Sequence, residues 1–149
     1  VVEPEQADCL LQSARHGRPA RASGCADSLM AGLACGEASP LAWRFLEPTV
    51  DWFMTIGDAH AAAAMRSFAT GEAGDVPIVS GESGAATLAA LRALADDAGL
   101  ARQVGLDRRS SVLLVNTEGA TAPALFASLT GLDDAAVRHA QSAWARRPS

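Results

Sequence analysis

SVLLVNTEG, residues 111–119, is the stretch of sequence that decides the fold class. Its continuous run Val-Leu-Leu-Val predicts a strand over residues 111–115, because a parallel strand covered by helices on both faces is apolar at every position. Strand-like composition also marks three earlier stretches, at residues 1–3, 50–56 and 76–79. Helical patterns alternate with these stretches, so the sequence predicts an α/β fold with a mostly parallel sheet.

Helical spacing and helix-end signals predict the elements between the strands. The clearest helix covers residues 59–70 behind a Gly57-Asp58 start, and a second alanine-rich helix follows Ala85. Further helices are predicted over residues 27–35, 40–47 and 133–146. Residues 13–26 carry three arginines, two glycines and a proline and are predicted to form an exposed excursion.

The composition excludes several classes of protein. The 149 residues hold 12 Lys plus Arg against 17 Asp plus Glu, a net charge of −5, so no basic excess is available for nucleic acid or an anionic membrane surface. The apolar runs are far too short to span a membrane and no signal peptide opens the sequence, so we expect a cytoplasmic protein. All the basic residues are arginine, and the first residue is Val1 rather than methionine, which indicates a piece of a longer product.

The three cysteines, Cys9, Cys25 and Cys35, show no CxxC spacing and no paired histidines, so a zinc site is not expected. Their odd number without a secretion signal favours reduced thiols. We interpret them as buried and unreactive, with a Cys9–Cys35 disulfide as the alternative.

Two polar segments are candidates for chemistry. SGESGA, residues 80–85, lies where a short strand gives way to a helix, and the free N–H groups of a helix start attract anions. Asn116 to Gly119 follow the strand over residues 111–115, and ligands of open α/β sheets bind beyond the carboxyl ends of strands. A plain turn is the alternative reading of each segment.

Other chemistry-bearing residues have simpler interpretations. None of the three histidines has a partner acid or nucleophile that the sequence can place, and Ser83 lacks the GxSxG spacing of a hydrolase nucleophile. Trp43, Trp52 and Met54 are predicted to fill the core rather than to line a cofactor site.

Several of these segments, in this order, resemble one family. The stretches are VEPE (residues 2–5), LMAGLACGE (29–37), SGESGA (80–85) and TEG (117–119). They resemble the carboxy-terminal part of the diaminopropionate ammonia-lyases, which are pyridoxal-phosphate (PLP) enzymes of the tryptophan-synthase-β, or fold type II, superfamily. The resemblance implies that residues 1–149 form a single carboxy-terminal portion of such a lyase, with a partial three-layer αβα architecture.

The resemblance also implies a reaction and a cofactor. These enzymes convert 2,3-diaminopropionate to pyruvate and ammonia by α,β-elimination with PLP, and dimers are common among them. Their cofactor-binding lysine belongs to the amino-terminal part, and this sequence has no lysine. The chain alone is therefore expected to be inactive and to supply no catalytic residue. A small amino acid is the expected substrate, and a homodimer the expected assembly.

Five residues can be carried over as cofactor-binding. Glu82, Ser83 and Gly84 match the family's turn beside the cofactor ring, and the position facing the pyridine nitrogen falls on Thr117, or on Asn116 if the register shifts by one. A hydroxyl there leaves the ring nitrogen largely unprotonated, which gives a milder electron sink suited to elimination.

The sequence predicts no metal site, and it leaves a second class of function open. Related racemases and dehydratases hold a divalent cation with acids near the Glu-Pro turn, but the second acid position falls on Cys9 here, so no metal is predicted. The alternative to an enzyme is a non-catalytic α/β remnant or interaction module, which the missing lysine favours.

Overall fold

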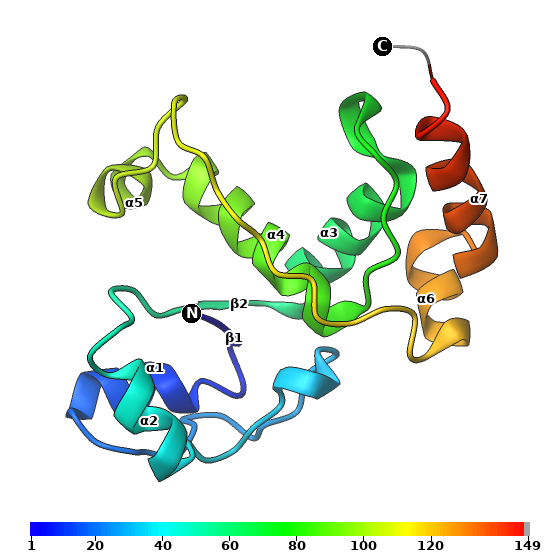
Figure 1. The fold of residues 1–149 in the computed structure, drawn as a ribbon. Helices are drawn as coiled ribbons and strands as arrows, with labels where there is room; N and C mark the ends of the chain where they lie inside the picture. Colours follow the sequence, from blue (N-terminus) through cyan, green and yellow to red (C-terminus); the bar gives the residue numbers. More distant parts are fainter. Residues whose placement is uncertain (148–149) are drawn as a thin grey trace.

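The structure is a computed structural model and describes residues 1–147. Two short parallel strands, β1 (Val2–Pro4) and β2 (Met54–Ile56), pair in the register Val2 with Met54. Helices lie on both sides of this pair, with α3 and α4 above it and α1 and α2 below it in Figure 1. The α/β class is therefore confirmed, and the small sheet is parallel as expected.

Seven α-helices occur among residues 1–147. They are α1 (Cys9–His16), α2 (Pro40–Leu46), α3 (Asp58–Thr70), α4 (Glu82–Asp96), α5 (Ala98–Gln103), α6 (Pro123–Thr130) and α7 (Asp134–Trp144), with single 3₁₀ turns η1 (Ala31–Leu33) and η2 (Glu72–Gly74). Ser39 accepts a hydrogen bond from the Ala42 N–H at the start of α2, and Asp133 accepts one from the Ala136 N–H at the start of α7. None of these helices combines the length and the apolar character needed to cross a membrane.

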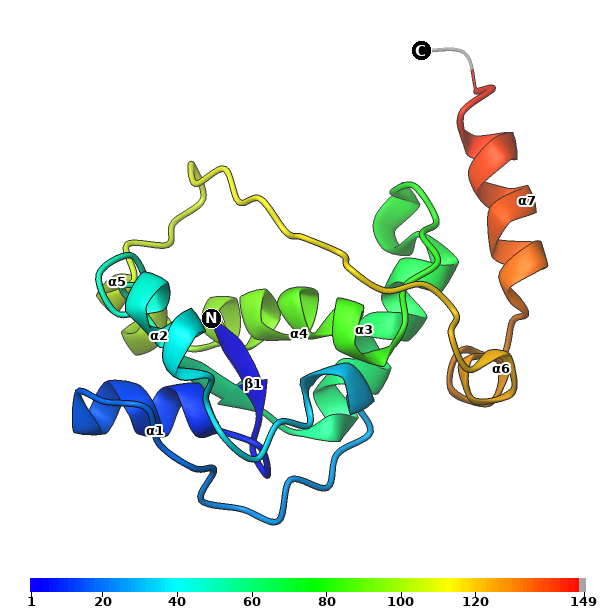
Figure 2. The ribbon, with the colours of Figure 1, turned by 60° about the horizontal axis from the view of Figure 1, so that its bottom comes forward.

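The core lies between α3 and α4. Alanines on the facing sides of the two helices, Ala61, Ala64, Ala85 and Ala89, are buried and allow a close approach, and Met65 fills the space between larger neighbours. The α6–α7 hairpin closes one end of this core through Phe126 and Val137, both fully buried (Figure 2). Hydrogen bonds from Arg66 to the Leu129 carbonyl and from the Trp144 indole to the Gly74 carbonyl fasten the hairpin.

Four of the helices follow the sequence prediction. α3, α4, α2 and α7 lie where the caps and apolar spacing indicated. The predicted helix over residues 27–35 is only the 3₁₀ turn η1, because Met30 and Ala34 leave the helical region of the backbone. Residues 13–16 belong to α1 rather than to an exposed excursion, and Ser13 is fully buried.

Two predicted strands are absent from residues 1–147. Residues 111–115 and 76–79 have no regular secondary structure and pair with no neighbouring strand. A strand needs a partner backbone, and the part of the chain that the structure describes places none beside them. In consequence Leu113 is 88% exposed, although its sequence context is typical of a buried strand.

Two side-chain predictions also need correction. Trp43 is buried and contacts the Phe53 ring at a tilt, and Met54 packs against the core, but Trp52 is 53% exposed. All three cysteines are free thiols, so the alternative Cys9–Cys35 disulfide is wrong. The predicted burial holds for Cys9 but is wrong for Cys25 and Cys35, which are exposed because they lie in the irregular chain between α1 and α2.

Candidate functional site

The first turn of α4 is a buried, tightly enclosed piece of backbone. Gly81 is its extended N-cap residue, and Ser80, Glu82 and Ser83 are all buried. A Cβ atom on Gly84 would overlap the Asn116 Oδ1 atom and lie 3.0 Å from the Glu118 carbonyl oxygen, so only glycine is accommodated there. The SGESGA segment thus forms a helix start against which another segment closes.

That other segment is the second candidate, residues 116–119. The Ser80 hydroxyl donates to Asn116 Oδ1 at 3.0 Å, and the Asn116 amide donates to the Val79 carbonyl at 3.2 Å. The Gly81 N–H donates to the Glu118 carbonyl at 3.0 Å. The structure therefore brings together the two polar segments that lie 36 residues apart in the sequence.

The Glu118 side chain completes the helix start. Its Oε2 accepts from the Ser83 N–H at 2.8 Å, and its Oε1 accepts from the Thr121 hydroxyl at 3.2 Å. A carboxylate is favourable at the positive end of a helix, where N–H groups lack partners within the helix. Glu118 was not among the residues predicted to have such a role, and its signal in the sequence is an acid three residues after the predicted strand.

A third segment reaches the same point. The Gly32 N–H donates to the Ser83 hydroxyl at 3.0 Å, and a Cβ atom on Gly32 would lie 2.9 Å from that oxygen. Gly32 belongs to the stretch LMAGLACGE, so three of the motifs quoted above meet around Ser83. Spacing along the sequence could not reveal this contact, because the two residues lie 51 positions apart.

Thr117 lies in a different position from its neighbour Asn116. Its side chain is exposed and makes no hydrogen bond to any residue between 1 and 147, whereas the Asn116 amide is bonded to Ser80 and Val79. Thr117 lines an open cavity of about 330 Å³. The other residues of its wall are Ile78, Val79, Asn116, Glu118 and Gly119, with Arg138 and Gln141 from α7.

The acids near the Glu-Pro turn have a structural role. The buried Glu3 carboxylate accepts from the N–H groups of Leu10 and Leu11, both at 2.8 Å, and so joins β1 to the start of α1. Burial raises the pKa of Glu3, and burial beside the Glu3 carboxylate raises the pKa of the Cys9 thiol to about 11. Asp8 bonds Gln12 and Ser23; burial alone would raise its pKa, but these hydrogen bonds outweigh burial and lower it.

Metal-ligand clusters are not found in the described part of the chain. No group of three or more His, Cys, Asp or Glu side chains between residues 1 and 147 is arranged to hold an ion. The Glu3 oxygens are instead committed to backbone N–H groups.

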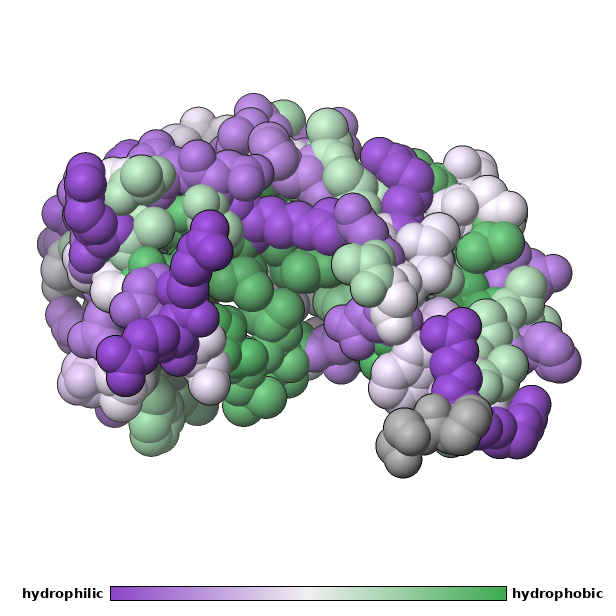
Figure 3. Space-filling view, turned by 90° about the horizontal axis from the view of Figure 1, so that it is seen from above, coloured by the Kyte–Doolittle hydropathy of each residue, from purple (hydrophilic) through white to green (hydrophobic). Residues whose placement is uncertain are grey.

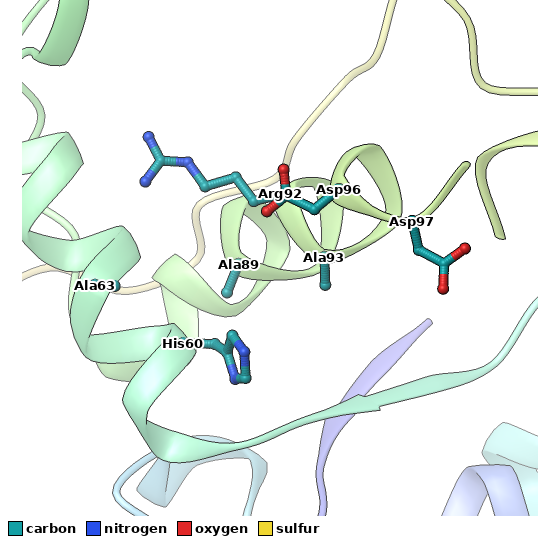
Figure 4. A pocket seen from close by; sticks show the side chains of 7 residues that line it. All are labelled: His60, Ala63, Ala89, Arg92, Ala93, Asp96 and Asp97. Carbon is teal, nitrogen blue, oxygen red and sulfur yellow. The ribbon is translucent and has the colours of Figure 1, made fainter. Parts of the chain in front are cut away.

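A separate cavity of about 450 Å³ lies between α3 and α4 (Figure 4). Its polar side chains do not converge on one point: the Arg92 guanidinium extends away from His60, and Asp96 and Asp97 point in different directions. Arg92 is bonded to Ser67 and to Glu72, which accounts for its orientation. This cavity is remote from the junction around Ser83 and offers no set of groups that act together.

The segments of this junction lie almost entirely within a part of the chain that matches a known protein family. Residues 1–118 match the model of a family described as pyridoxal-phosphate dependent enzyme. The chain belongs to this family. The matched residues include β1, η1, α4 and most of the segment that closes on α4, so the resemblance inferred from the motifs is confirmed.

Individual relatives carry a more specific name. Diaminopropionate ammonia-lyase of Salmonella typhimurium is 40% identical over 132 residues, which are 85% of this chain and 33% of that protein. The protein of the same name from Escherichia coli K12 is 37% identical over 124 residues, which are 81% of this chain and 31% of that protein. The chain therefore spans about a third of the length of the curated relatives it matches.

Solved structures show the same relationship. Diaminopropionate ammonia lyase from Escherichia coli, in complex with an aminoacrylate–PLP azomethine reaction intermediate, superposes with a TM-score of 0.76 at 34% identity, over 87% of this chain and 33% of that one. A threonine deaminase from T.th. superposes with a TM-score of 0.61 at 24% identity, over 82% of this chain and 39% of that one. The second similarity concerns the fold alone.

Proposed function

We propose that this chain forms the cofactor-lining carboxy-terminal part of a cytoplasmic, PLP-dependent ammonia-lyase that converts 2,3-diaminopropionate to pyruvate and ammonia. The observation that carries the proposal is the junction around Ser83, where three of the segments that resemble the diaminopropionate ammonia-lyases meet. A homodimer is part of the proposal by analogy with the same family.

The residues of the junction suit the pyridine ring of PLP. Gly81 and Gly84 carry no side chain and so let residues 116–119 lie close against the first turn of α4. This places the Thr117 hydroxyl, which has no partner among residues 1–147, at an open cavity beside that turn. A hydroxyl can donate to a ring nitrogen that carries no proton. When bound, the cofactor supplies the electron sink for the elimination. Because the sequence has no lysine, the covalent anchor for the cofactor has to come from residues outside these 149.

Each residue of the junction has its own role in the proposed site. Thr117 rather than Asn116 binds the ring nitrogen, because the Asn116 amide is already bonded to Ser80 and Val79. Glu82, Ser83 and Gly84 form the surface beside the ring, and Glu118 and Gly32 hold that surface in place through Ser83. Glu118 and Gly32 are thus positioning residues.

The test uses the complete polypeptide encoded by the reading frame that contains this chain. We expect bound PLP and pyruvate release from 2,3-diaminopropionate, with serine and threonine as the competing substrates to compare. Thr117→Val removes a hydrogen bond worth about 1–3 kcal/mol, so PLP affinity is expected to fall on the order of tenfold or more. Thr117→Ser, which keeps the hydroxyl, is the matched control.

Three results would overturn the proposal or a part of it. A complete polypeptide without a lysine-containing segment, unable to bind PLP, would favour the non-catalytic remnant or interaction module instead. A purified protein that binds PLP but releases pyruvate only from serine, or 2-oxobutyrate only from threonine, would contradict the substrate. Unchanged PLP affinity in Thr117→Val would contradict the role of that residue.

A further inference from the structure

Residues 27–35 carry Gly32 to the junction around Ser83. Their regular structure is limited to the 3₁₀ turn η1. Their hydrogen bonds to the rest of the described chain run to two residues, Asp58 at one end and Ser83 at the other, and the remaining bonds stay within the segment. Because the segment belongs to no longer helix and to no sheet, these two contacts and the burial of Met30 determine where η1 lies.

The Asp58 carboxylate forms the first of the two contacts. Its Oδ1 accepts from the Ser28 hydroxyl at 2.7 Å, and its Oδ2 accepts from the Leu29 N–H at 2.9 Å. Asp58 is the first residue of α3, where the positive end of the helix favours an acid. Both oxygens are bonded to the segment rather than to the N–H groups of α3. The carboxylate thus links the helix that forms the core to the residues just before η1.

One tight turn connects this contact to Ser83. The Ala31 N–H donates to the Leu29 carbonyl at 2.9 Å, which closes the chain into a turn directly after the Asp58 contact. The Met30 side chain is fully buried, so the turn cannot move outward without exposing it. Gly32 follows in the same turn and donates to the Ser83 hydroxyl at 3.0 Å. A displacement of Leu29 is therefore transmitted to Gly32 over a single turn of backbone.

We propose that Asp58 is a positioning residue of the proposed cofactor site. Its carboxylate fixes the start of η1, and η1 in turn places the Gly32 N–H against the Ser83 hydroxyl. Glu118 holds the Ser83 N–H from the other direction, so two carboxylates restrain this residue, one through its hydroxyl and one through its backbone. The inference rests on the proposed function, because it assigns Ser83 to the surface beside the cofactor ring.

The test follows the Gly32 amide and the affinity for PLP in variants of the complete polypeptide. Asp58 is exposed, so Asp58→Ala removes both acceptors without opening the core. We expect the Gly32 amide to exchange with solvent roughly tenfold faster in the protein without PLP, because its contact with Ser83 is no longer held in place. The affinity for PLP should fall roughly fivefold. Asp58→Asn keeps an acceptor for the Leu29 N–H and should restore part of both losses.

Asp97→Ala is the matched control. The Asp97 carboxylate also accepts two hydrogen bonds at the start of a helix, from the N–H groups of Gly99 and Leu100, but it bonds no residue of the segment 27–35. Its loss should leave Gly32 exchange and PLP affinity unchanged. The Met65 amide, in the middle of α3, serves as the internal reference for a general loss of stability.

Three results would overturn the proposal. Unchanged Gly32 exchange in Asp58→Ala would show that η1 keeps its place without the carboxylate. Equal acceleration at Gly32 and at Met65 would reveal a general loss of stability instead of a positioning role. Faster Gly32 exchange with unchanged PLP affinity would separate Asp58 from the cofactor surface.

Failure of the proposed function has a different signature. An unsubstituted complete polypeptide that binds no PLP would contradict that function. The exchange of the Gly32 amide is measured without PLP, so it still decides whether Asp58 holds η1 against Ser83.

Discussion

The two sides of α4 show how differently one helix can be completed. On the side toward α3, Ala85 and Ala89 are buried against a helix from the same chain. On the side toward an apolar groove of about 570 Å³, Thr87, Leu91 and Leu94 follow at helical spacing but have only a partial cover. Small side chains allow two helices of the same chain to pack closely against each other. The larger leucines have to be covered by a sheet, and residues 1–147 form only two strands of one.

We call the α3–α4 contact the closed side of α4. The apolar groove lined by Leu91, Leu94, Val112 and Leu114 is its open side. From above (Figure 3), hydrophobic side chains gather in the middle of the molecule between more polar lobes.

The largest expected effect tests the closed side. Met65→Ala should lower the free energy of unfolding by about 2–5 kcal/mol, because a fully buried side chain is lost and a cavity remains. Leu94→Ala, on the open side, should cost less than about 1 kcal/mol in the chain alone. Urea unfolding followed by circular dichroism measures both. Equal losses would mean that the two sides are equally packed.

The second-largest effect is expected at the junction around Ser83. Gly84→Ala places a Cβ atom against the Asn116 side chain and should destabilise the chain by about 1–3 kcal/mol through overpacking. Gly119→Ala is the matched control, because nothing lies within 4 Å of a Cβ atom there, and it should change stability by no more than about 0.5 kcal/mol. A neutral Gly84→Ala would show that residues 116–119 are not held against α4.

The third effect is a pH dependence at the contact between β1 and the start of α1, which belongs to neither side of α4. Burial raises the folded-state pKa of Glu3 above its usual value of 4.5, so the folded chain binds this proton more tightly than the unfolded chain. Its contribution to stability is therefore complete below that value and decreases as the pH rises through the raised pKa. One pKa unit corresponds to about 1.4 kcal/mol. In Glu3→Gln, the free energy of unfolding should fall less between about pH 4.5 and 7 than it does in the unsubstituted chain. The same pH profile in both proteins would contradict this prediction.

The smallest effect belongs to the open side. Leu113→Ser should alter the stability of the chain alone by less than about 0.5 kcal/mol, because the side chain is already exposed to water. The same substitution in the complete polypeptide sharpens the comparison. A loss that appears only there would show that residues 111–115 become buried on that face too.

The difference between the sides also explains what the sequence could predict. α3 and α4 follow from alanine-rich patterns and local end signals, since a helix makes its backbone hydrogen bonds within itself. Residues 111–115 have a strand's composition, but a strand depends on partners that are distant in sequence, so the prediction failed where no partner is present among residues 1–147. The same reason accounts for Trp52, which sequence composition placed in the core.

The candidate site divides in the same way. The two polar segments could be picked out because each follows an apolar run, and the structure brings them together. Their connections through Glu118 and Gly32 could not be predicted, because each joins residues far apart in the sequence, by 35 and 51 positions. Whether Glu82, Ser83, Gly84, Asn116 and Thr117 bind the cofactor stays a prediction.

The bond between Ser83 and Glu118 has a consequence for the order in which the chain folds. It closes a loop of 35 residues, and closing such a loop costs entropy that a local helix start would not require. On the ribosome, the Ser83 N–H can gain this partner only after residue 118 has emerged, although the helix itself can form as soon as it is synthesised. The surface proposed to receive the cofactor is therefore completed later than the helix on which it lies.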